Sequence, residues 1–265
     1  MLDLKNISKT FHPGTPDEKK AITDLSLHLD PGDFVTIIGS NGAGKSTLFN
    51  LVAGSILSDS GSIVLDGRDI TMLADHRRSK FIGRMFQDPL RGTAPHMTIE
   101  ENLALAYLRA SGHSSPFSKV SKADRAEFRA RLAQLGLGLE DRMKQQVGLL
   151  SGGQRQALTL LMATLVTPKL LLLDEHTAAL DPATAEKVLA LTSSIVAEKG
   201  ITCMMITHNI ATALALGNRT LMMADGRIVL ELRGKEREGM TVEALMQRFR
   251  ERTGGGLDND RMLLE

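Results

Sequence analysis

The sequence has few aromatic residues and only one cysteine. Phe, Trp and Tyr together make up 3% of its 265 residues, and tryptophan is missing altogether. So few rings argue against a surface that stacks nucleic-acid bases. The single cysteine, Cys203, excludes an internal disulfide and a zinc site built from several thiolates. Because Cys203 lies in the apolar run 201–206, we expect it to serve as buried packing.

The chain also lacks a charge excess and a long hydrophobic run. Its formal net charge is +1, so the overall electrostatic potential of the protein does not attract nucleic acid. We therefore expect no nucleic-acid partner. No apolar run approaches the roughly 18 residues of a membrane-spanning helix. The start, Met1 to Lys5, is unlike a signal peptide. We therefore expect a cytoplasmic protein that reaches a membrane only through a partner.

What the chain does have is a glycine-rich loop between a predicted strand and a predicted helix. Residues 39–47 match the phosphate-loop pattern G-x-x-x-x-G-K-[ST] at every fixed position. The apolar run 34–38 predicts a buried strand, and 47–54 predicts a helix that a glycine ends. Free N–H groups at the loop and at the helix N-terminus favour binding of an anion. Lys45 adds a positive charge for the β- and γ-phosphates, and the Ser46 hydroxyl is a candidate Mg2+ ligand. The expected nucleotide-binding residues are Gly39, Ser40, Asn41, Gly42, Ala43, Gly44, Lys45, Ser46 and Thr47.

The rest of the chain predicts an α/β fold with one helical insertion. Residues 1–35 predict antiparallel strands, and 98–167 have a mostly helical pattern with a polar break at 111–116. We place one nucleotide-binding domain at 1–253, with a helical subdomain at about 88–167 and a C-terminal tail at 254–265. Further predicted elements are strands at 61–67, 82–87, 170–173 and 201–206, a hairpin at 220–232, and helices at 183–199, 211–216 and 241–252.

Two acidic residues follow a fully apolar predicted strand. Asp174 and Glu175 come directly after Leu170 to Leu173. Side chains at the C-terminal end of a strand lie where open α/β sheets bind ligands. We therefore interpret Asp174 as a candidate Mg2+ ligand and Glu175 as the candidate base that polarises the attacking water.

Two other polar residues also end predicted strands. Gln87 precedes the helical insertion, and its amide can reach Mg2+ or the water; an ordinary surface glutamine is the alternative. His208 follows the strand at 201–206, where it is a candidate to contact the γ-phosphate and orient the water. A purely structural histidine is the alternative there.

A serine and two glycines open another predicted helix. Ser151 is a plausible N-cap, and Ser151-Gly152-Gly153 at a helix N-terminus is a second anion site by the same physics as the first. One chain has little use for two such sites on one nucleotide, whereas two chains facing each other could share them. The alternative is a capped helix after a glycine turn.

Taken together and in this order, the motifs resemble the nucleotide-binding domain of ATP-binding cassette (ABC) proteins over roughly residues 2–232. The resemblance implies a P-loop NTPase of the ABC ATPase fold, with an antiparallel β subdomain, an inserted α-helical subdomain, and ATP and Mg2+ as ligands. The matching motifs are the phosphate loop, Gln87, the signature Leu150 to Gln154, Asp174-Glu175, the turn from Ala178 to Asp181, and His208.

The resemblance adds two expectations at single residues. Position alone favours packing of Phe11 in the core, but the family has an aromatic near its first strand that stacks on adenine, and Phe11 matches it. His176 is a departure, because the family commonly has proline after the catalytic glutamate. This loosens the expected geometry of the turn but not the expected chemistry.

The resemblance also implies a head-to-tail dimer. Each ATP is held between the phosphate loop of one chain and the signature of the other, so Ser151 and Gly153 act in trans. Further nucleotide contacts implied in the same way are Gly152, Gln154 and Asp181.

The sequence looks closest to stand-alone bacterial importer ATPases, and loosely to those that serve amino-acid permeases. The expected function is the ATP-hydrolysing subunit of a membrane transporter, on the inner face of the cell membrane. Its expected partners are a second copy or a homologous ATPase subunit and integral-membrane permease subunits, with an extracytoplasmic solute-binding protein as a further candidate. A soluble ABC ATPase, such as one for iron–sulfur cluster assembly, is the alternative. Import is the expected direction of transport, and export is the alternative.

Overall fold

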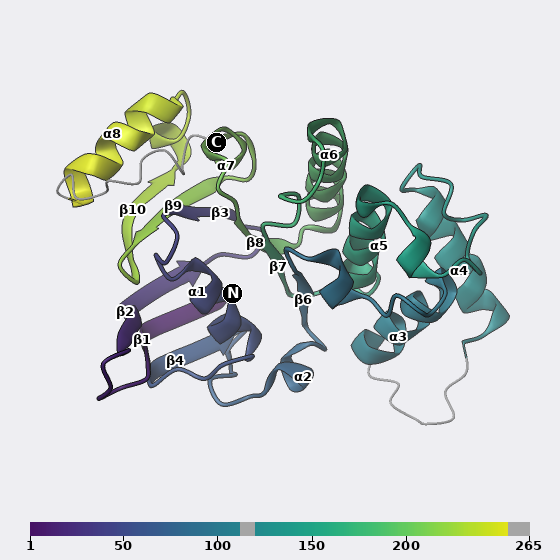
Figure 1. Ribbon diagram of the computed structural model, residues 1–265, viewed down its shortest axis with the longest axis horizontal. Coiled ribbons are helices and arrows are strands. Elements are labelled where there is room, and N and C mark those ends of the chain that lie inside the picture. Colours follow the sequence, from purple (N-terminus) through teal and green to yellow (C-terminus); the bar gives the residue numbers. More distant parts are fainter. Residues whose placement is uncertain (112–119, 254–265) are drawn as a thin grey trace. The chain divides into compact units, whose positions relative to one another are not determined.

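The computed structural model describes residues 1–111 and 120–253, and the chain forms two compact units (Figure 1). Unit 1 joins Met1–Arg78 to the chain from Thr202 onward, and unit 2 is Ser79–Ile201. Most of the polar break predicted at 111–116, and the tail predicted at 254–265, lie outside the described residues.

Unit 1 contains an antiparallel sheet with the strand order β2-β1-β4-β5. Leu4 pairs with Leu27 on one side and with Ile63 on the other. Leucines and isoleucines at alternate positions, such as Leu2, Leu4, Leu27 and Leu29, are buried because successive side chains of a strand point to opposite faces. The antiparallel strands predicted here are confirmed. The strands are β1 (Leu2–Phe11), β2 (Lys19–Leu29), β4 (Ser60–Leu65) and β5 (Arg68–Asp69).

A parallel set of strands in unit 1 carries the phosphate loop. Strand β3 (Phe34–Gly39) pairs in parallel with both β8 (Thr202–Ile206) and β9 (Arg219–Ala224), and β10 (Arg227–Arg233) pairs antiparallel with β9. All six residues of β3 are buried, as expected for a central parallel strand. Cys203 on β8 is buried too, as the sequence predicted.

Four helices of unit 1 lie within residues 1–78 and 202–253. Helix α1 (Lys45–Ala53) begins at the phosphate-loop lysine, two residues before the predicted start, and ends where Gly54 turns left-handed at φ 81°. Helix α8 (Val242–Thr253) packs Leu245, Met246 and Phe249 into a cluster with Ile210 of α7. The remaining helices are α2 (Asp75–Arg78) and α7 (Ile210–Ala215), and a short 3-10 turn, η3, spans Gly234–Glu236.

Unit 2 holds two parallel strands and the long helix that follows them. Strand β6 (Ile82–Met85) pairs with β7 (Leu170–Asp174), with Met85 opposite Leu173. Helix α6 (Pro182–Lys199) starts with a proline at its first position, where the missing N–H costs nothing. These elements agree with the strands and the helix predicted for this part of the chain.

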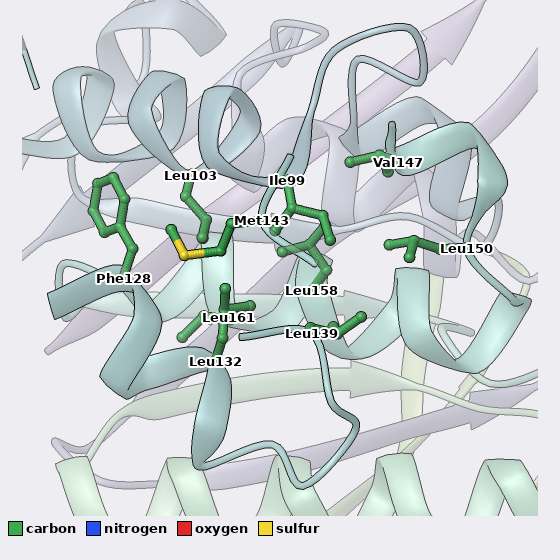
Figure 2. Close-up of a cluster of buried hydrophobic side chains, with 10 residues drawn as sticks. All are labelled: Ile99, Leu103, Phe128, Leu132, Leu139, Met143, Val147, Leu150, Leu158 and Leu161. Atoms are coloured by element: carbon green, nitrogen blue, oxygen red, sulfur yellow. The ribbon is translucent and has the colours of Figure 1, made fainter. Parts of the chain in front are cut away.

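The helical part of unit 2 has its own core (Figure 2). It is built by α3 (Ile99–Ser111), α4 (Lys122–Ala133) and α5 (Gly152–Thr164), with short 3-10 turns η1 (Pro89–Gly92) and η2 (Val147–Leu149). The helical pattern predicted at 98–167 is wrong for 134–149, which contains loops and turns, in part because Gly136 and Gly138 both adopt φ 65°. The buried cluster consists of Ile99, Leu103, Phe128, Leu132, Leu139, Met143, Val147, Leu150, Leu158 and Leu161.

None of the helices in residues 1–111 and 120–253 combines the length and the apolar character that crossing a bilayer requires.

Candidate functional site

The phosphate loop is built into unit 1 by close backbone packing. Gly44 is the N-cap of α1 at φ 100°, and a Cβ there would come within 2.5 Å of the Ala21 carbonyl oxygen. The next carbonyl before it, that of Ala43, accepts a hydrogen bond from the Gly226 N–H at 3.1 Å. Only glycine fits both the conformation and the space at position 44. The loop therefore has a fixed shape, held by β2 and by the turn between β9 and β10.

Lys45 and the start of α1 give this loop a positive character. The Lys45 side chain is 7% exposed, and its Nζ donates to the carbonyl oxygens of Gly39 at 2.6 Å and Ser40 at 3.0 Å. No side chain caps the N-terminus of α1, and its first turn has no acidic residue. Ser46, the next residue, is exposed. Helix N–H groups and an ammonium at one loop are the arrangement that phosphate oxygens need.

His208 lies at the same edge of the parallel strands as the phosphate loop. The last pair between β3 and β8 is Ile37 opposite Ile206, so two residues further along Gly39 is level with His208. His208 is half-buried, and Asn209 beside it caps α7 by accepting from the Thr212 N–H at 2.8 Å. The strand end and the cap together fix the backbone at His208.

Phe11, the last residue of β1, is partly exposed and does not belong to the buried core. Its ring lies 5.9 Å from the Lys9 Nζ, measured to the ring centroid. An accessible ring at a strand end is compatible with stacking on a base, and that role stays a prediction.

In unit 2, Gln87 and Glu175 follow the paired ends of two strands. Because Met85 of β6 lies opposite Leu173 of β7, the register puts Gln87 level with Glu175. Gln87 is exposed, while Asp174 and Glu175 are half-buried. Glu175 adopts a left-handed backbone with φ 45°, which is uncommon for a residue with a Cβ. An amide and two carboxylates thus share one end of this strand pair.

Arg84 is a neighbour of Asp174 that the sequence reasoning missed. Its Nη2 lies 3.8 Å from Asp174 Oδ2, and both side chains are largely buried, at 14% and 16% exposed. The guanidinium also lies over the Phe86 ring, 4.6 Å from the centroid. The register of β6 with β7 brings Arg84 opposite Leu172, two residues before Asp174. Because the pairing of β6 with β7 joins distant parts of the chain, no local sequence pattern indicated that Arg84 lies near Asp174.

The predicted signature forms the first turn of α5. Ser151 Oγ accepts from the Gln154 N–H at 3.3 Å, and Gln154 Oε1 accepts from the Ser151 N–H at 3.2 Å, which is a capping box. Leu150, just before it, belongs to the helical core in Figure 2. A Cβ on Gly153 would meet Thr184 Cγ2 at 2.2 Å, so this glycine lets α5 and α6 approach closely. The N-cap predicted at Ser151 is confirmed.

Asp181 is the N-cap residue of helix α6 in unit 2. Its Oδ1 accepts from the Thr184 N–H at 3.1 Å and so caps α6. Hydrogen bonding to Thr184 holds the pKa of this exposed carboxyl below its usual range. A contact of Asp181 with nucleotide remains a prediction.

His176 is buried, which the sequence did not indicate. Its imidazole Nε2 lies 3.3 Å from Thr192 Oγ1, and its carbonyl accepts from the side-chain amide of Gln156. Burial lowers the pKa of His176 to about 4, so the ring is neutral at neutral pH. In the sequence, only the presence of a histidine directly after the candidate base hinted that this position is unusual.

The structure thus groups the predicted residues unit by unit. Phe11, the phosphate loop and His208 belong to unit 1, whereas Gln87, the signature, Glu175 and Asp181 belong to unit 2. In residues 1–111 and 120–253, no group of three or more His, Cys, Asp or Glu side chains is arranged to hold a metal ion.

Comparison with known proteins identifies the family. Residues 22–178, more than half of the chain, match the family described as ABC transporter. The chain belongs to the ABC transporter family. It is 45% identical to a tyrosine transport ATP-binding protein of Clostridioides difficile, over 94% of this chain and 98% of that protein. It is 34% identical to a methionine import ATP-binding protein of Corynebacterium efficiens, covering 86% of this chain but only 61% of that longer relative.

Solved ABC cassettes share the fold. A dimeric ATP-binding cassette in a post-hydrolysis state with ADP and phosphate is 28% identical, with a TM-score of 0.74 over 88% of this chain and 98% of that one. The ADP conformation of another cassette from an ABC transporter is 28% identical, with a TM-score of 0.76 over 96% of this chain and 98% of that one. The predicted ABC ATPase fold is confirmed, and so is the prediction of an ATP-hydrolysing subunit of an ABC transporter.

Proposed function

We propose that this ABC ATPase powers a bacterial importer for an amino acid, with tyrosine or a related aromatic amino acid as the first candidate. The observation that carries this proposal is the 45% identity with a tyrosine transport ATP-binding protein, because it extends over almost the full length of both chains. The identity with the methionine import protein is lower and covers a smaller share of that protein. The solute class is therefore inferred from the relative that matches end to end.

ATP is the substrate, and its phosphates are proposed to bind at residues 39–47. The buried ammonium of Lys45 lies at the loop, where it neutralises the β- and γ-phosphates. The fixed glycine backbone at Gly44 lets the N–H groups of α1 point at the same oxygens. Phe11 supplies a ring for the adenine.

The chain's own residues fit Mg2+ as a partner of ATP. Mg2+ prefers hard oxygen ligands and is usually held by one or two carboxylates together with phosphates rather than by a protein cage. The exposed Ser46 hydroxyl, the Gln87 amide and the Asp174 carboxylate are such ligands. The absence of a three-residue metal cluster in the described parts of the chain agrees with this mode of binding. Bound Mg2+ would neutralise charge on the phosphates.

Hydrolysis is proposed to use Glu175 as the group that accepts a proton from the attacking water. Glu175 is half-buried, and the register puts Gln87 level with it at the same strand end. Gln87 is proposed to hold the water or Mg2+ through its neutral amide. His208, level with Gly39 in unit 1, is proposed to contact the γ-phosphate.

Two copies of the chain are proposed to enclose two ATP molecules. The signature of one copy, with Ser151 and Gly153, contacts the nucleotide held by the phosphate loop of the other. The dimeric state of the related cassette with ADP and phosphate supports this arrangement. Permease subunits in the membrane are the second partner, and they hold the ATPase at the inner face of the cell membrane. An extracytoplasmic solute-binding protein is proposed as the third component.

Reconstituted uptake tests the solute class. The chain is combined in vesicles with its permease and binding protein, and uptake of labelled tyrosine is measured with and without internal ATP. We expect ATP-dependent uptake that unlabelled phenylalanine or tryptophan inhibits more strongly than arginine or glutamate does. Lys45→Ala should abolish uptake and hydrolysis, because the phosphates lose their buried cation. Uptake of an unrelated solute with no response to any amino acid would contradict the proposal.

A further inference from the structure

The segment after Glu175 is anchored to both flanking helices of unit 2. The carbonyl of His176 accepts a hydrogen bond from Gln156 Nε2 on α5, and the His176 ring Nε2 lies 3.3 Å from Thr192 Oγ1 on α6. Gln156, His176 and Thr192 are only 1%, 2% and 0% exposed. One residue is therefore held through its main chain by one helix and through its side chain by the other.

The direction of the His176–Thr192 hydrogen bond follows from Thr192. The Thr192 hydroxyl donates to the Val188 carbonyl at 2.7 Å, so its hydrogen is already used. Its oxygen is left to accept from the imidazole Nε2–H of His176. The neutral ring with its proton on Nε2 satisfies this geometry, and the ring orientation is fixed by it.

Glu175 needs such anchors because of its backbone conformation. A residue with a Cβ at φ 45° is strained, by about 1–3 kcal/mol, and it keeps that conformation only where its surroundings determine it. The Glu175 carbonyl accepts from the Ala178 N–H at 3.0 Å, which closes a tight turn. The Gln156 bond then fixes the next carbonyl along, so both peptide groups after the Glu175 Cα are held.

Gln156 has one further feature that singles out its donor group. Its amide oxygen Oε1 is buried, and within residues 1–111 and 120–253 it has no hydrogen-bond partner. A buried polar atom without a partner costs about 1–3 kcal/mol. A methionine of similar size would avoid that cost, so the contribution of the amide to this site is its bond to His176.

We propose that Gln156 and the His176–Thr192 hydrogen bond position Glu175 for catalysis. Gln156 lies on the second turn of α5, whose first turn is the signature, so one helix carries both the proposed partner-nucleotide contact and the anchor of the catalytic segment. None of the three residues is assigned a contact with ATP or water; they are positioning residues. This inference rests on the proposed role of Glu175 as the base.

The first test is Gln156→Met in the full-length chain. The side chain keeps its volume but loses the donor, so we expect kcat for Mg-ATP hydrolysis to fall by about tenfold to hundredfold, as a misplaced base requires. KM should stay within about twofold of wild type, because phosphate binding at 39–47 is untouched. A kcat reduced by less than about twofold would overturn the proposal.

The second test is a double-mutant cycle at the ring. Thr192→Val removes the acceptor of the imidazole N–H and should lower kcat by about threefold to tenfold. His176→Pro keeps the carbonyl that Gln156 holds and stiffens the backbone, so it should stay within about tenfold of wild type. In that background Thr192→Val should have no further effect, and Gln156→Met should still lower kcat. Thr192→Val acting equally in both backgrounds would overturn the role of the ring.

A matched control separates positioning from stability. Thr164 is also on α5, is fully buried, and donates from its hydroxyl to the Leu160 carbonyl at 2.8 Å. Within the described part of the chain, its side chain makes no hydrogen bond to residues 175–178. Thr164→Val should be destabilised in thermal unfolding yet keep kcat within about twofold. If it lowers kcat as much as Gln156→Met does, the effect is structural and the proposal fails.

Glu175→Gln distinguishes this inference from the proposed function. If Glu175→Gln hydrolyses ATP at the wild-type rate, the role of Glu175 as base is wrong. If Glu175→Gln is inactive while Gln156→Met is fully active, only the positioning role is wrong. If Gln156→Met does not fold, the double-mutant cycle of Thr192→Val with His176→Pro tests the positioning role instead.

Discussion

At the scale of single residues, the guanidinium of Arg84 places a positive charge beside the proposed Mg2+ ligand Asp174. The two side chains are 3.8 Å apart and largely buried, so solvent screens their interaction less than it would at the surface. A cation at this distance stabilises the ionised carboxylate but also repels a divalent ion that approaches it. If Asp174 binds Mg2+ as proposed, Arg84 should therefore weaken that binding.

Arg84→Gln should lower the Mg2+ concentration needed for half-maximal ATP hydrolysis. Removing one positive charge favours the metal by on the order of 1 kcal/mol at a partly buried site, which is about a fivefold change. The measurement is a Mg2+ titration of the ATPase rate at saturating ATP. The matched control is Arg91→Gln, because Arg91 lies 5.6 Å from the same Phe86 ring but has no ion pair with Asp174 among the described interactions. An unchanged or higher Mg2+ requirement in Arg84→Gln would contradict this account.

Phe11 offers a second test at a single position. Its ring is partly exposed at the end of β1, so truncation removes little buried packing. Phe11→Ala should weaken ATP binding by ~0.5–1.5 kcal/mol, and Phe11→Tyr should bind ATP almost as well as wild type. Equilibrium binding of ATP, with thermal unfolding measured in parallel, checks both variants. A loss of stability with unchanged ATP affinity would show that the ring only packs.

The residues that could be predicted from sequence are those whose motif is local. The phosphate loop has its shape and its charge within nine residues, and Ser151 with Gln154 forms its cap within four. Arg84, Gln156 and Thr192 could not be predicted in the same way. Their partners lie far along the chain, and only the register of β6 with β7 or the packing of α5 and α6 brings them together.

At the scale of elements, the alternation of strand and helix was largely predictable, and two departures have physical causes. Helix α1 begins at Lys45 because Gly44 caps it in a left-handed conformation that glycine allows. The periodicity of hydrophobic residues does not reveal such a helix start. The stretch 134–149 contains enough leucine to suggest a helix, but two left-handed glycines prevent one, and Leu135, Leu137 and Leu139 pack in the helical core from a loop instead. Composition alone does not separate a helix from a loop packed on helices.

Arg78 ties the far end of the phosphate-loop helix to the rest of unit 1. It is fully buried, and its guanidinium donates to the carbonyls of Leu51 and Val52 at the end of α1 and of Thr71 and Leu73. Burial lowers its pKa to about 10, so it is still charged at neutral pH. A cation at a helix C-terminus also interacts favourably with the helix dipole.

Arg78→Met should therefore destabilise the protein strongly. The carbonyls that Arg78 satisfies would be left without their donor, and we expect a loss of more than about 3 kcal/mol in the free energy of unfolding. Urea unfolding measures it, with Arg77→Met as the control, because Arg77 is on the same short helix but exposed. A loss equal to that of the control would show that the four hydrogen bonds contribute nothing net.

At the scale of the whole molecule, the chain carries two segments suited to one nucleotide, on different units. The phosphate loop belongs to unit 1 and the signature to unit 2. Both segments are helix N-termini with small residues, and both can bind an anion by the same physics. Two nucleotides held between two copies would use all four segments. On this proposal the oligomeric state follows the nucleotide.

Glu175→Gln makes that dependence measurable. The amide keeps the size of the side chain but cannot accept a proton, so hydrolysis should fall by ~10²–10⁴ while ATP still binds. The change also removes a negative charge near the γ-phosphate, which favours the closed pair. Gel filtration of Glu175→Gln should give a dimer with Mg-ATP and a monomer with ADP.

Adding Ser151→Arg should abolish the dimer, because a long charged side chain blocks the shared site from the partner's side. The control Ser194→Arg, at an exposed position of α6, should leave the dimer intact. Because Ser151 and Glu175 lie on the same chain, loss of the dimer with retained ATP binding would show that the signature acts on the nucleotide of the other copy. An inactive Glu175→Gln protein that binds ATP yet stays monomeric at high concentration would refute dimerisation of the isolated chain and would assign the pairing to the permease.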